Sequence, residues 1–256
     1  MKNNMPIKMI VTDLDGTLLR EDKTISERTK AILAQCRLKG HKVVYATGRG
    51  SSSKILAPSE MFDGFIRMNG ATAYIGDTHI HNRLIPIDKV RGLLIAADAA
   101  NIKIAAESGE VHYANFNVGE LWPWLQRHYE PADFTRLDIE IEKIYAIAET
   151  PKVTELINKH LSDELYLYIS RDNLAMVMHS DAVKSKAAAA LAEHWNIKRH
   201  EIAAFGDDSN DIDLLKYCGV GVAMGNALDE VKAAAAHICD TNDNDGVAKW
   251  LEENVL

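Results

Sequence analysis

The sequence has no long run of apolar residues. No window approaches the roughly 20 consecutive apolar residues that a membrane-spanning helix needs. The first ten residues, MKNNMPIKMI, also contain no apolar segment of the kind that directs secretion. We therefore expect neither membrane insertion nor export.

Cysteine is scarce as well. The three cysteines, Cys36, Cys218 and Cys239, are odd in number and far apart, and no CxxC pair occurs. A disulfide framework needs an even number of cysteines, and zinc sites and redox dithiols need closely spaced ones. The cysteine pattern therefore argues against these chemistries and favours a reducing compartment, the cytoplasm.

Basic residues are outnumbered by acidic ones. The chain has 29 Lys and Arg against 37 Asp and Glu, which gives a formal net charge of −8. This charge opposes binding to a long phosphate backbone, so we expect no nucleic acid partner and a small phosphate-bearing ligand, if any. With 256 residues and 47% hydrophobic content, the chain can form one large domain or a domain with a sizeable insert. Nothing in the sequence indicates an oligomeric state.

Four short apolar runs stop at polar residues with a glycine nearby. They are IKMIVTDLDG, KVVYATGRG, DGFIRMNGA and EIAAFGDDSND, and each predicts a buried strand ending at Asp, Thr or Asn. Helical patterns alternate with them, which is typical of a parallel α/β sheet covered by helices. Because such sheets bind ligands beyond the carboxyl ends of their strands, we expect these polar residues to meet there.

Helix signals lie between the strands. In TISERTKAILAQCRLKG, Thr24 and Glu27 have the spacing of a capping box, and Gly40 marks the stop. Farther on, KSKAAAALAEHWNI predicts an alanine-rich helix, and SNDIDLLKYCG predicts a helix with Ser209 as its cap. The segment GVGVAMG predicts one more strand.

The middle of the chain has a different pattern. Residues 83–182 contain short strand patterns and two helical ones, with aromatic residues concentrated there, and none of these strands ends in an acid and glycine pair. We interpret residues 83–182 as a second, smaller α/β unit inserted into a core formed by residues 1–82 and 183–256.

Two carboxylates one residue apart, Asp13 and Asp15, end the first apolar run. Crowded carboxylates raise each other's pKa unless a cation or hydrogen-bond donors hold them, so such pairs often bind metal or perform acid and base chemistry. Gly16 and Thr17 indicate that the chain is already turning there. The alternative is that both acids only cap the turn.

Four ordered segments resemble the signatures of one family. DLDGTLL at 13–19, ATGR at 46–49, Lys184 and GDDSND at 206–211 resemble the haloacid dehalogenase (HAD) superfamily, in its Cof-type phosphatase branch. NGA at 69–71 and GVA at 246–248 extend the resemblance, and the insert is similar to a C2 (C2B-like) cap. The resemblance implies a Rossmann-like core, Mg²⁺ dependence and hydrolysis of phosphate monoesters.

The family's pattern also implies roles for the acidic residues. Asp13 would attack phosphorus to form an aspartyl phosphate, and Asp15 would protonate the leaving group and then activate water. The metal ligands would be Asp13, the backbone carbonyl of Asp15 and Asp207. Asp211 would support the metal through water, while Asp208 fills a variable position.

Phosphate binding is assigned to four residues. Thr47 offers a hydroxyl, Gly48 an accessible backbone, and Lys184 a compact positive charge. Asn210 would reach the phosphate or fix Lys184. For Arg49 both a substrate contact and a structural role remain open. Ser185 departs from the family's pattern, which has glycine after the lysine.

Three other features have weaker links to function. His79 and His81 lie in a polar, hairpin-like stretch and are expected at the surface. DTNDNDG at 240–246 lacks the glycine and glutamate of a calcium loop, so we expect a turn near the core site. Trp122 and Trp124 could stack on a substrate or simply pack.

The sequence thus predicts a Mg²⁺-dependent phosphatase for a small phosphorylated metabolite, such as a sugar phosphate or a phosphorylated cofactor precursor. The insert would select the substrate. The alternatives are a phosphomutase-like phosphotransferase and a non-catalytic, phospho-accepting regulatory or binding protein.

Overall fold

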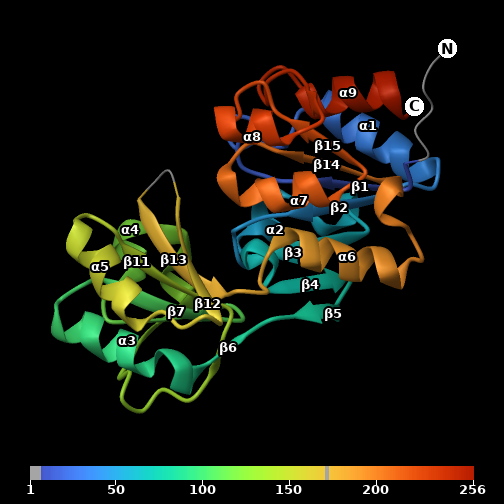
Figure 1. The fold of residues 1–256 in the computed structure, drawn as a ribbon. Helices are drawn as coiled ribbons and strands as arrows, with labels where there is room; N and C mark the ends of the chain where they lie inside the picture. Colours follow the sequence, from blue (N-terminus) through green and yellow to red (C-terminus); the bar gives the residue numbers. More distant parts are fainter. Residues whose placement is uncertain (1–6, 171–172) are drawn as a thin grey trace. The chain divides into compact units, whose positions relative to one another are not determined.

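A computed structural model of the chain describes residues 7–170 and 173–256. The chain divides into two compact units, one formed by residues up to Asn82 together with Val183–Leu256, and the other by Arg83–Ala182 (Figure 1). Each unit has its own hydrophobic core.

An eight-stranded sheet forms the centre of the first unit. Six neighbouring strands are parallel: β16 (His237–Ile238), β15 (Val220–Ala223), β14 (Ile202–Gly206), β1 (Met9–Thr12), β2 (Lys42–Ala46) and β3 (Gly64–Arg67). The antiparallel strands β4 (Thr72–Ile75) and β5 (Thr78–Asn82) extend the sheet beyond β3. The predicted α/β fold with a central parallel sheet is confirmed, and the antiparallel extension is an addition to it.

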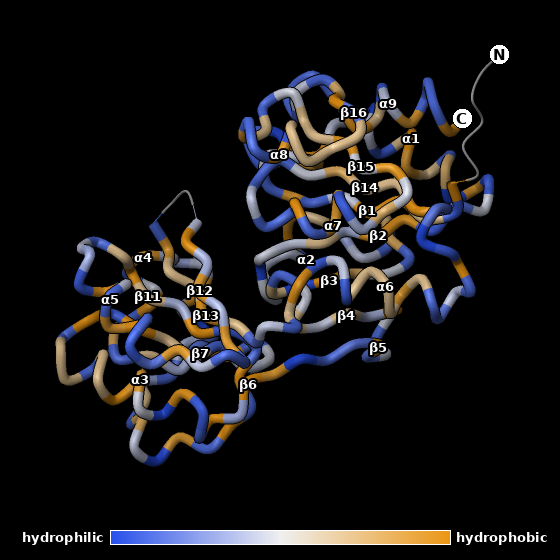
Figure 2. The backbone as a smooth tube through the Cα atoms, viewed as in Figure 1, coloured by the Kyte–Doolittle hydropathy of each residue, from blue (hydrophilic) through white to orange (hydrophobic). Residues whose placement is uncertain are grey.

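The central strands are apolar because helices cover both faces of the sheet. All four residues of β1 and all five of β14 are buried, as expected for parallel strands between two helix layers. By contrast, the edge strand β5, with the sequence THIHN, is largely hydrophilic (blue in Figure 2). A polar edge opposes pairing with strands of other molecules.

Helices pack on the two faces of this sheet (Figure 1). Helices α1 and α9 pack together on one face, and α6 and α7 pack together on the other. The helices of this unit are α1 (Glu27–Leu38), α2 (Ser53–Leu56), α6 (Lys184–His194), α7 (Ile212–Tyr217), α8 (Asp229–Ala234) and α9 (Gly246–Asn254). Short 3-10 helices occur at Ser59–Met61, Met68–Gly70, Arg199–Glu201 and Ser209–Asp211. Among the described residues, no helix combines the length and the hydrophobicity required to span a membrane.

Two helix starts differ from the sequence prediction. The N-cap of α1 is Ser26, whose side chain accepts a hydrogen bond from the Thr29 backbone, so the predicted cap at Thr24 is wrong. The hydroxyl of Thr24 instead donates to Asp22. Ahead of α7, Asp208 rather than Ser209 caps the first turn. In both cases several residues suited to capping are adjacent, and the path of the chain into the helix selects among them.

The second unit is a mixed sheet backed by two helices. The six-stranded sheet has the order β12-β13-β11-β7-β8-β9, and β6 pairs separately with β10. Its strands are β6 (Ile85–Pro86), β7 (Ile104–Ser108), β8 (Val111–Ala114), β9 (Tyr129–Pro131), β10 (Glu140–Ile141), β11 (Lys143–Ile147), β12 (Leu165–Ile169) and β13 (Leu174–His179). Its helices are α3 (Ile87–Ala99), α4 (Val118–Leu121) and α5 (Pro151–His160), with a 3-10 helix at Pro123–His128. Helices α3 and α5 pack together over the hydrophobic core of this unit.

The strand ends of the first unit fix the position of the polar residues. Asp13 directly follows β1, Thr47 follows β2, and Asp207 follows β14. Because β14, β1 and β2 are parallel neighbours, these three residues lie at the same edge of the sheet. This edge carries the candidate site.

The capping assignment can be tested by denaturation. We expect Ser26→Ala to lower the free energy of unfolding by about 1 kcal/mol, because the Thr29 N–H loses its acceptor. The matched control, Thr24→Ala, should change it by less than about 0.5 kcal/mol, because Thr24 is exposed and caps nothing. Urea denaturation followed by circular dichroism measures both. A larger loss in Thr24→Ala would contradict the assignment.

Candidate active site

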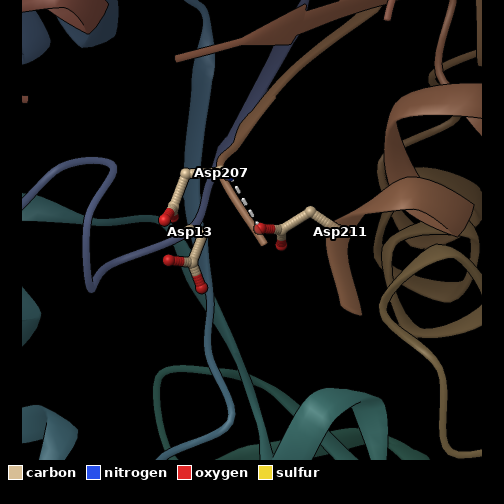
Figure 3. A group of neighbouring side chains, drawn as sticks. All are labelled: Asp13, Asp207 and Asp211. Atoms are coloured by element: carbon tan, nitrogen blue, oxygen red, sulfur yellow. Dashed lines mark hydrogen bonds between the residues drawn. The ribbon is translucent and has the colours of Figure 1, made fainter. Parts of the chain in front are cut away.

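Three buried carboxylates meet at the carboxyl edge of the first sheet. Ligand oxygens of Asp13, Asp207 and Asp211 all lie within 4.8 Å of one another (Figure 3). The exposed fractions of these residues are 6%, 2% and 0%. Strand pairing brings the first two together, since the Asp13 N–H donates to the Phe205 carbonyl of β14 at 3.0 Å. The arrangement unites residues nearly two hundred positions apart in the chain.

The turn after β1 packs directly on Asp207. Gly16 has a φ of +76°, and a Cβ atom there would lie 2.4 Å from Asp207 Oδ2. Thr17 donates its hydroxyl hydrogen to Asp207 Oδ1 at 2.8 Å. The glycine is therefore required both for the left-handed turn and for the close approach.

Lys184 supplies the positive charge of this site. Its Nζ donates to Asp13 Oδ1 at 2.7 Å and to Asp211 Oδ1 at 2.5 Å, and its side chain is fully buried. Burial alone would lower the pKa of Lys184, but the charges of the two carboxylates outweigh burial and raise it. Lys184 is therefore an ammonium at neutral pH.

One ammonium does not balance the carboxylates around it. Burial raises the pKa of Asp13 well above its ordinary value, and the charges of Asp211 and Asp207 raise it further, against the opposing effect of Lys184. A cation bound between Asp13 and Asp207 would favour the ionised carboxylates. The site therefore has the charge and the hard oxygen donors for a divalent metal ion.

Both oxygens of Asp211 accept hydrogen bonds. Oδ1 accepts from Lys184, and Oδ2 accepts from the backbone N–H groups of Asp207 and Asp208 at 3.0 and 3.1 Å. Asp211 thus fixes the loop that carries Asp207. This geometry is consistent with the supporting position predicted for Asp211.

Asp15 is held by two cations. Arg49 donates to both of its oxygens, from Nε at 2.5 Å and from Nη2 at 2.8 Å, and Lys23 Nζ donates to Oδ1 at 3.0 Å. Burial favours a higher pKa for Asp15, but the hydrogen bonds and charges of Arg49 and Lys23 outweigh it, so the pKa is lowered. Arg49, for which a substrate contact and a structural role were both left open, contacts Asp15 in this structure. Sequence reasoning missed Lys23, which lies in an irregular turn with a φ of 64° and matches no motif.

The residues assigned to phosphate binding surround the ends of β2 and β3. Thr47 is buried, and its hydroxyl accepts from the Arg49 N–H at 3.1 Å. Gly48 lies between Thr47 and Arg49 in the same loop. The Asn69 N–H donates to the Thr47 carbonyl, and Asn210 Nδ2 donates to Asn69 Oδ1 at 2.8 Å. In the sequence, NGA at 69–71 served only as part of the family resemblance, and Asn69 was not predicted as the partner of Asn210.

The remaining candidates lie elsewhere. His79 belongs to the hairpin strand β5 and packs against the Tyr74 ring, 4.1 Å away between centroids. Trp122 makes an edge contact with Tyr145 within the second unit, whereas Trp124 is 57% exposed. The loop at 240–246 contacts Leu19 and Arg20, at the end of the turn after β1, as expected for a turn near the site.

The comparisons with known proteins agree with this arrangement. A family model of haloacid dehalogenase-like hydrolases matches residues 10–251. The 5-amino-6-(5-phospho-D-ribitylamino)uracil phosphatase YitU of Bacillus subtilis is 30% identical over 261 residues, which cover 96% of each chain. The structure is similar to a haloacid dehalogenase-like hydrolase from Bacteroides thetaiotaomicron, with a TM-score of 0.86, 26% identity, and coverage of 96% of this chain and 98% of the other. It is also similar to a HAD subclass IIB sugar phosphatase, with a TM-score of 0.84, 25% identity, and coverage of 96% and 98%.

These matches extend over nearly the whole chain and include every strand end of the candidate site. They confirm the predicted resemblance and the prediction that the protein is an enzyme. The chain belongs to the haloacid dehalogenase-like hydrolases.

Proposed function

We propose that this chain is a Mg²⁺-dependent phosphatase that hydrolyses a small phosphorylated metabolite through an aspartyl phosphate on Asp13. The observation that carries the proposal is the buried pair of Asp13 and Asp207 beside the Lys184 ammonium. Phosphoryl transfer needs a nucleophile, neutralisation of phosphate charge and a proton for the leaving group. This edge of the sheet has residues for all three.

The proposed metal ligands are the carboxylates of Asp13 and Asp207 and the backbone carbonyl of Asp15. Magnesium prefers a few such hard oxygens, completed by water and phosphate oxygens. The contacts of Asp211 with Lys184 and the backbone support a position beside the metal, reached through water, for this residue. When bound, Mg²⁺ would neutralise the charge of the phosphoryl group and so let an anionic ester approach an anionic nucleophile.

Two steps follow from these positions. In the first, a carboxylate oxygen of Asp13 attacks phosphorus, the bond from phosphorus to the ester oxygen breaks, and Asp15 gives its proton to that oxygen. In the second, Asp15 takes a proton from water, the water oxygen attacks phosphorus, and Asp13 is released with inorganic phosphate. The lowered pKa of Asp15 favours the ionised form that the second step requires and opposes the protonated form that the first step requires, so Asp15 has to separate from Arg49 and Lys23 before it donates its proton.

The phosphoryl group would be bound by the residues around the ends of β2 and β3. The Thr47 hydroxyl, the Gly48 backbone N–H and the Asn210 amide provide hydrogen-bond donors. Lys184 adds a positive charge, and its contact with Asp13 places that charge next to the attacking oxygen. Donors fixed before the substrate binds stabilise charge that develops during the reaction.

The selection of the substrate would depend on the second unit. We propose that Arg83–Ala182 is a C2-type cap that contacts the leaving group, because the residues named above bind only the phosphoryl end. Trp122 and Trp124 are candidates for contacts with the substrate. The relatives support a sugar phosphate or a phosphorylated cofactor precursor, since one is named for a phosphorylated ribityl compound and another is a sugar phosphatase. The three unpaired cysteines support a cytoplasmic location.

Turnover of p-nitrophenyl phosphate tests the reaction. We expect phosphate release that depends on Mg²⁺, stops with a chelator, and is abolished in Asp13→Asn, which lacks the nucleophilic carboxylate. Asp208→Asn is the matched control and should keep most of the activity, because asparagine caps a helix as well as aspartate does. Equal rates in the wild type and Asp13→Asn would end the phosphatase proposal. Release that needs a bisphosphate activator would identify a phosphomutase instead.

The role of Asp15 predicts a dependence on the leaving group. Asp15→Asn should lower kcat by about 10²- to 10⁴-fold for an alkyl phosphate, with KM changed little, because the alkoxide needs the proton. The loss should be smaller for p-nitrophenyl phosphate, whose leaving group is stable as an anion. Steady-state kinetics with both substrates measure the difference. An equal loss for both substrates would exclude proton donation by Asp15.

The close contact between Gly16 and Asp207 predicts the effect of one added methyl group. Gly16→Ala should raise the Mg²⁺ concentration for half-maximal activity roughly tenfold or more, because the Cβ displaces the Asp207 carboxylate. Gly76→Ala is the matched control, because Gly76 also has a positive φ, of +57°, but open space around it. Titration with Mg²⁺ compares the two. Equal shifts would mean that backbone strain, and not contact with Asp207, causes the effect.

A further inference from the structure

Two buried or half-buried asparagines connect the ends of the turn after β1. Asn226 Nδ2 donates to the Gly16 carbonyl at 2.7 Å, and Asn242 Nδ2 donates to the Leu19 carbonyl at 2.9 Å. The Asn242 N–H in turn donates to Asn226 Oδ1 at 3.1 Å. The side chain of Asn226 and the backbone N–H and side chain of Asn242 thus form one continuous bridge from Gly16 to Leu19, which we call the amide bridge.

The turn depends on this bridge for the hydrogen-bond donors to two of its carbonyls. Its own N–H groups are satisfied internally, since Leu18 donates to the Asp13 carbonyl at 3.3 Å and Leu19 to the Leu14 carbonyl at 2.8 Å. The carbonyls of Gly16 and Leu19 instead accept from side chains more than two hundred residues away. Asn242 is only 4% exposed, so water is a poor replacement for its amide.

The residues on the bridged turn are those of the proposed chemistry. Asp15 directly precedes Gly16, and Thr17 follows it and binds Asp207. A displacement of Gly16 therefore moves the Asp15 carbonyl on one side and the Thr17 contact with Asp207 on the other. Errors of about 1 Å in such positions can cost roughly 10²-fold in rate.

The loop that carries Asn242 is itself fixed to the same segment. Asp245 forms an ion pair with Arg20 at 2.9 Å, and Asp243 accepts from the Glu21 N–H at 3.0 Å. These contacts involve the DTNDNDG stretch at 240–246, which has no part in the reaction derived above. They hold the loop that carries Asn242 beside the segment that follows Leu19.

We propose that Asn226 and Asn242 are positioning residues of the active site, which hold Asp15 and, through Thr17, Asp207 in the geometry that the reaction requires. The proposal rests on the proposed phosphatase function. It assigns no contact with substrate to either residue. The competing view is that the amide bridge only stabilises the fold.

Kinetics of four variants distinguish the two views. In Asn242→Ala and Asn226→Ala we expect kcat to fall about 10- to 100-fold with KM within a few-fold of wild type, because the phosphate-binding residues lie outside the bridge. The double variant should lose little more than either single variant, since either change breaks the same bridge. The control Asn244→Ala removes an exposed amide of the same loop, bonded only to Asp240 among the contacts described, and should leave kcat unchanged.

A second measurement is independent of turnover. Isothermal titration calorimetry with MgCl₂ should show affinity weakened roughly tenfold in Asn242→Ala and unchanged in Asn244→Ala, because Asp207 loses its fixed position. Circular dichroism and thermal melting report whether each variant is folded at the assay temperature. Rates are then expressed per folded molecule.

The outcomes separate the two proposals. If wild type hydrolyses phosphate esters and folded Asn242→Ala matches its kcat and its Mg²⁺ affinity, the positioning role is overturned while the phosphatase function stands. The positioning role is also overturned if Asn242→Ala lowers only the melting temperature, or if losses in the two single variants multiply in the double variant. If wild type shows no Mg²⁺-dependent turnover, the proposed function itself fails.

Discussion

The charge balance at the carboxyl edge of the first sheet governs the rest of this structure. Three buried carboxylates lie together, and the one ammonium among them pairs with only two, Asp13 and Asp211. Two unit charges about 4 Å apart repel by roughly 4 kcal/mol at an effective dielectric constant of 20. A domain's whole stability is only about 5–15 kcal/mol. An arrangement of this kind persists when a function requires it and when the surrounding contacts fix it. The contacts of Asp211 with Lys184 and the backbone, and of Thr17 with Asp207, do so here.

Parallel strand pairing explains why much of this site could be predicted from the sequence. A strand that ends in Asp or Thr places that residue at the carboxyl edge, and all such edges coincide in a parallel sheet. Asp13 and Asp207 could therefore be brought together without knowledge of side-chain contacts, and the ion pair of Lys184 with Asp13 agrees with the charge expected there. The signal lay in short apolar runs and their last residues.

The parts that could not be predicted depend on contacts without a local pattern. Lys23 reaches Asp15 from an irregular turn, and the approach of Asn242 to Leu19 joins segments more than two hundred residues apart. No periodicity or spacing encodes such a meeting. The predicted N-cap of α1 was wrong for a related reason. Thr24 and Ser26 are both suitable N-caps, and only the path of the chain selects Ser26. Sequence thus indicates which residues lie at the edge of the sheet, whereas tertiary packing determines their partners.

The two acids of DLDG show how packing places identical side chains in different electrostatic environments. Asp13 faces the buried carboxylates, and burial and their charges raise its pKa, so its ionised form depends on a compensating positive charge. Asp15 points instead to Arg49 and Lys23, which outweigh the effect of burial and lower its pKa. The carboxyl groups of these two residues thus have pKa values that are shifted in opposite directions. Packing, and not residue type, therefore sets the protonation behaviour of each carboxyl.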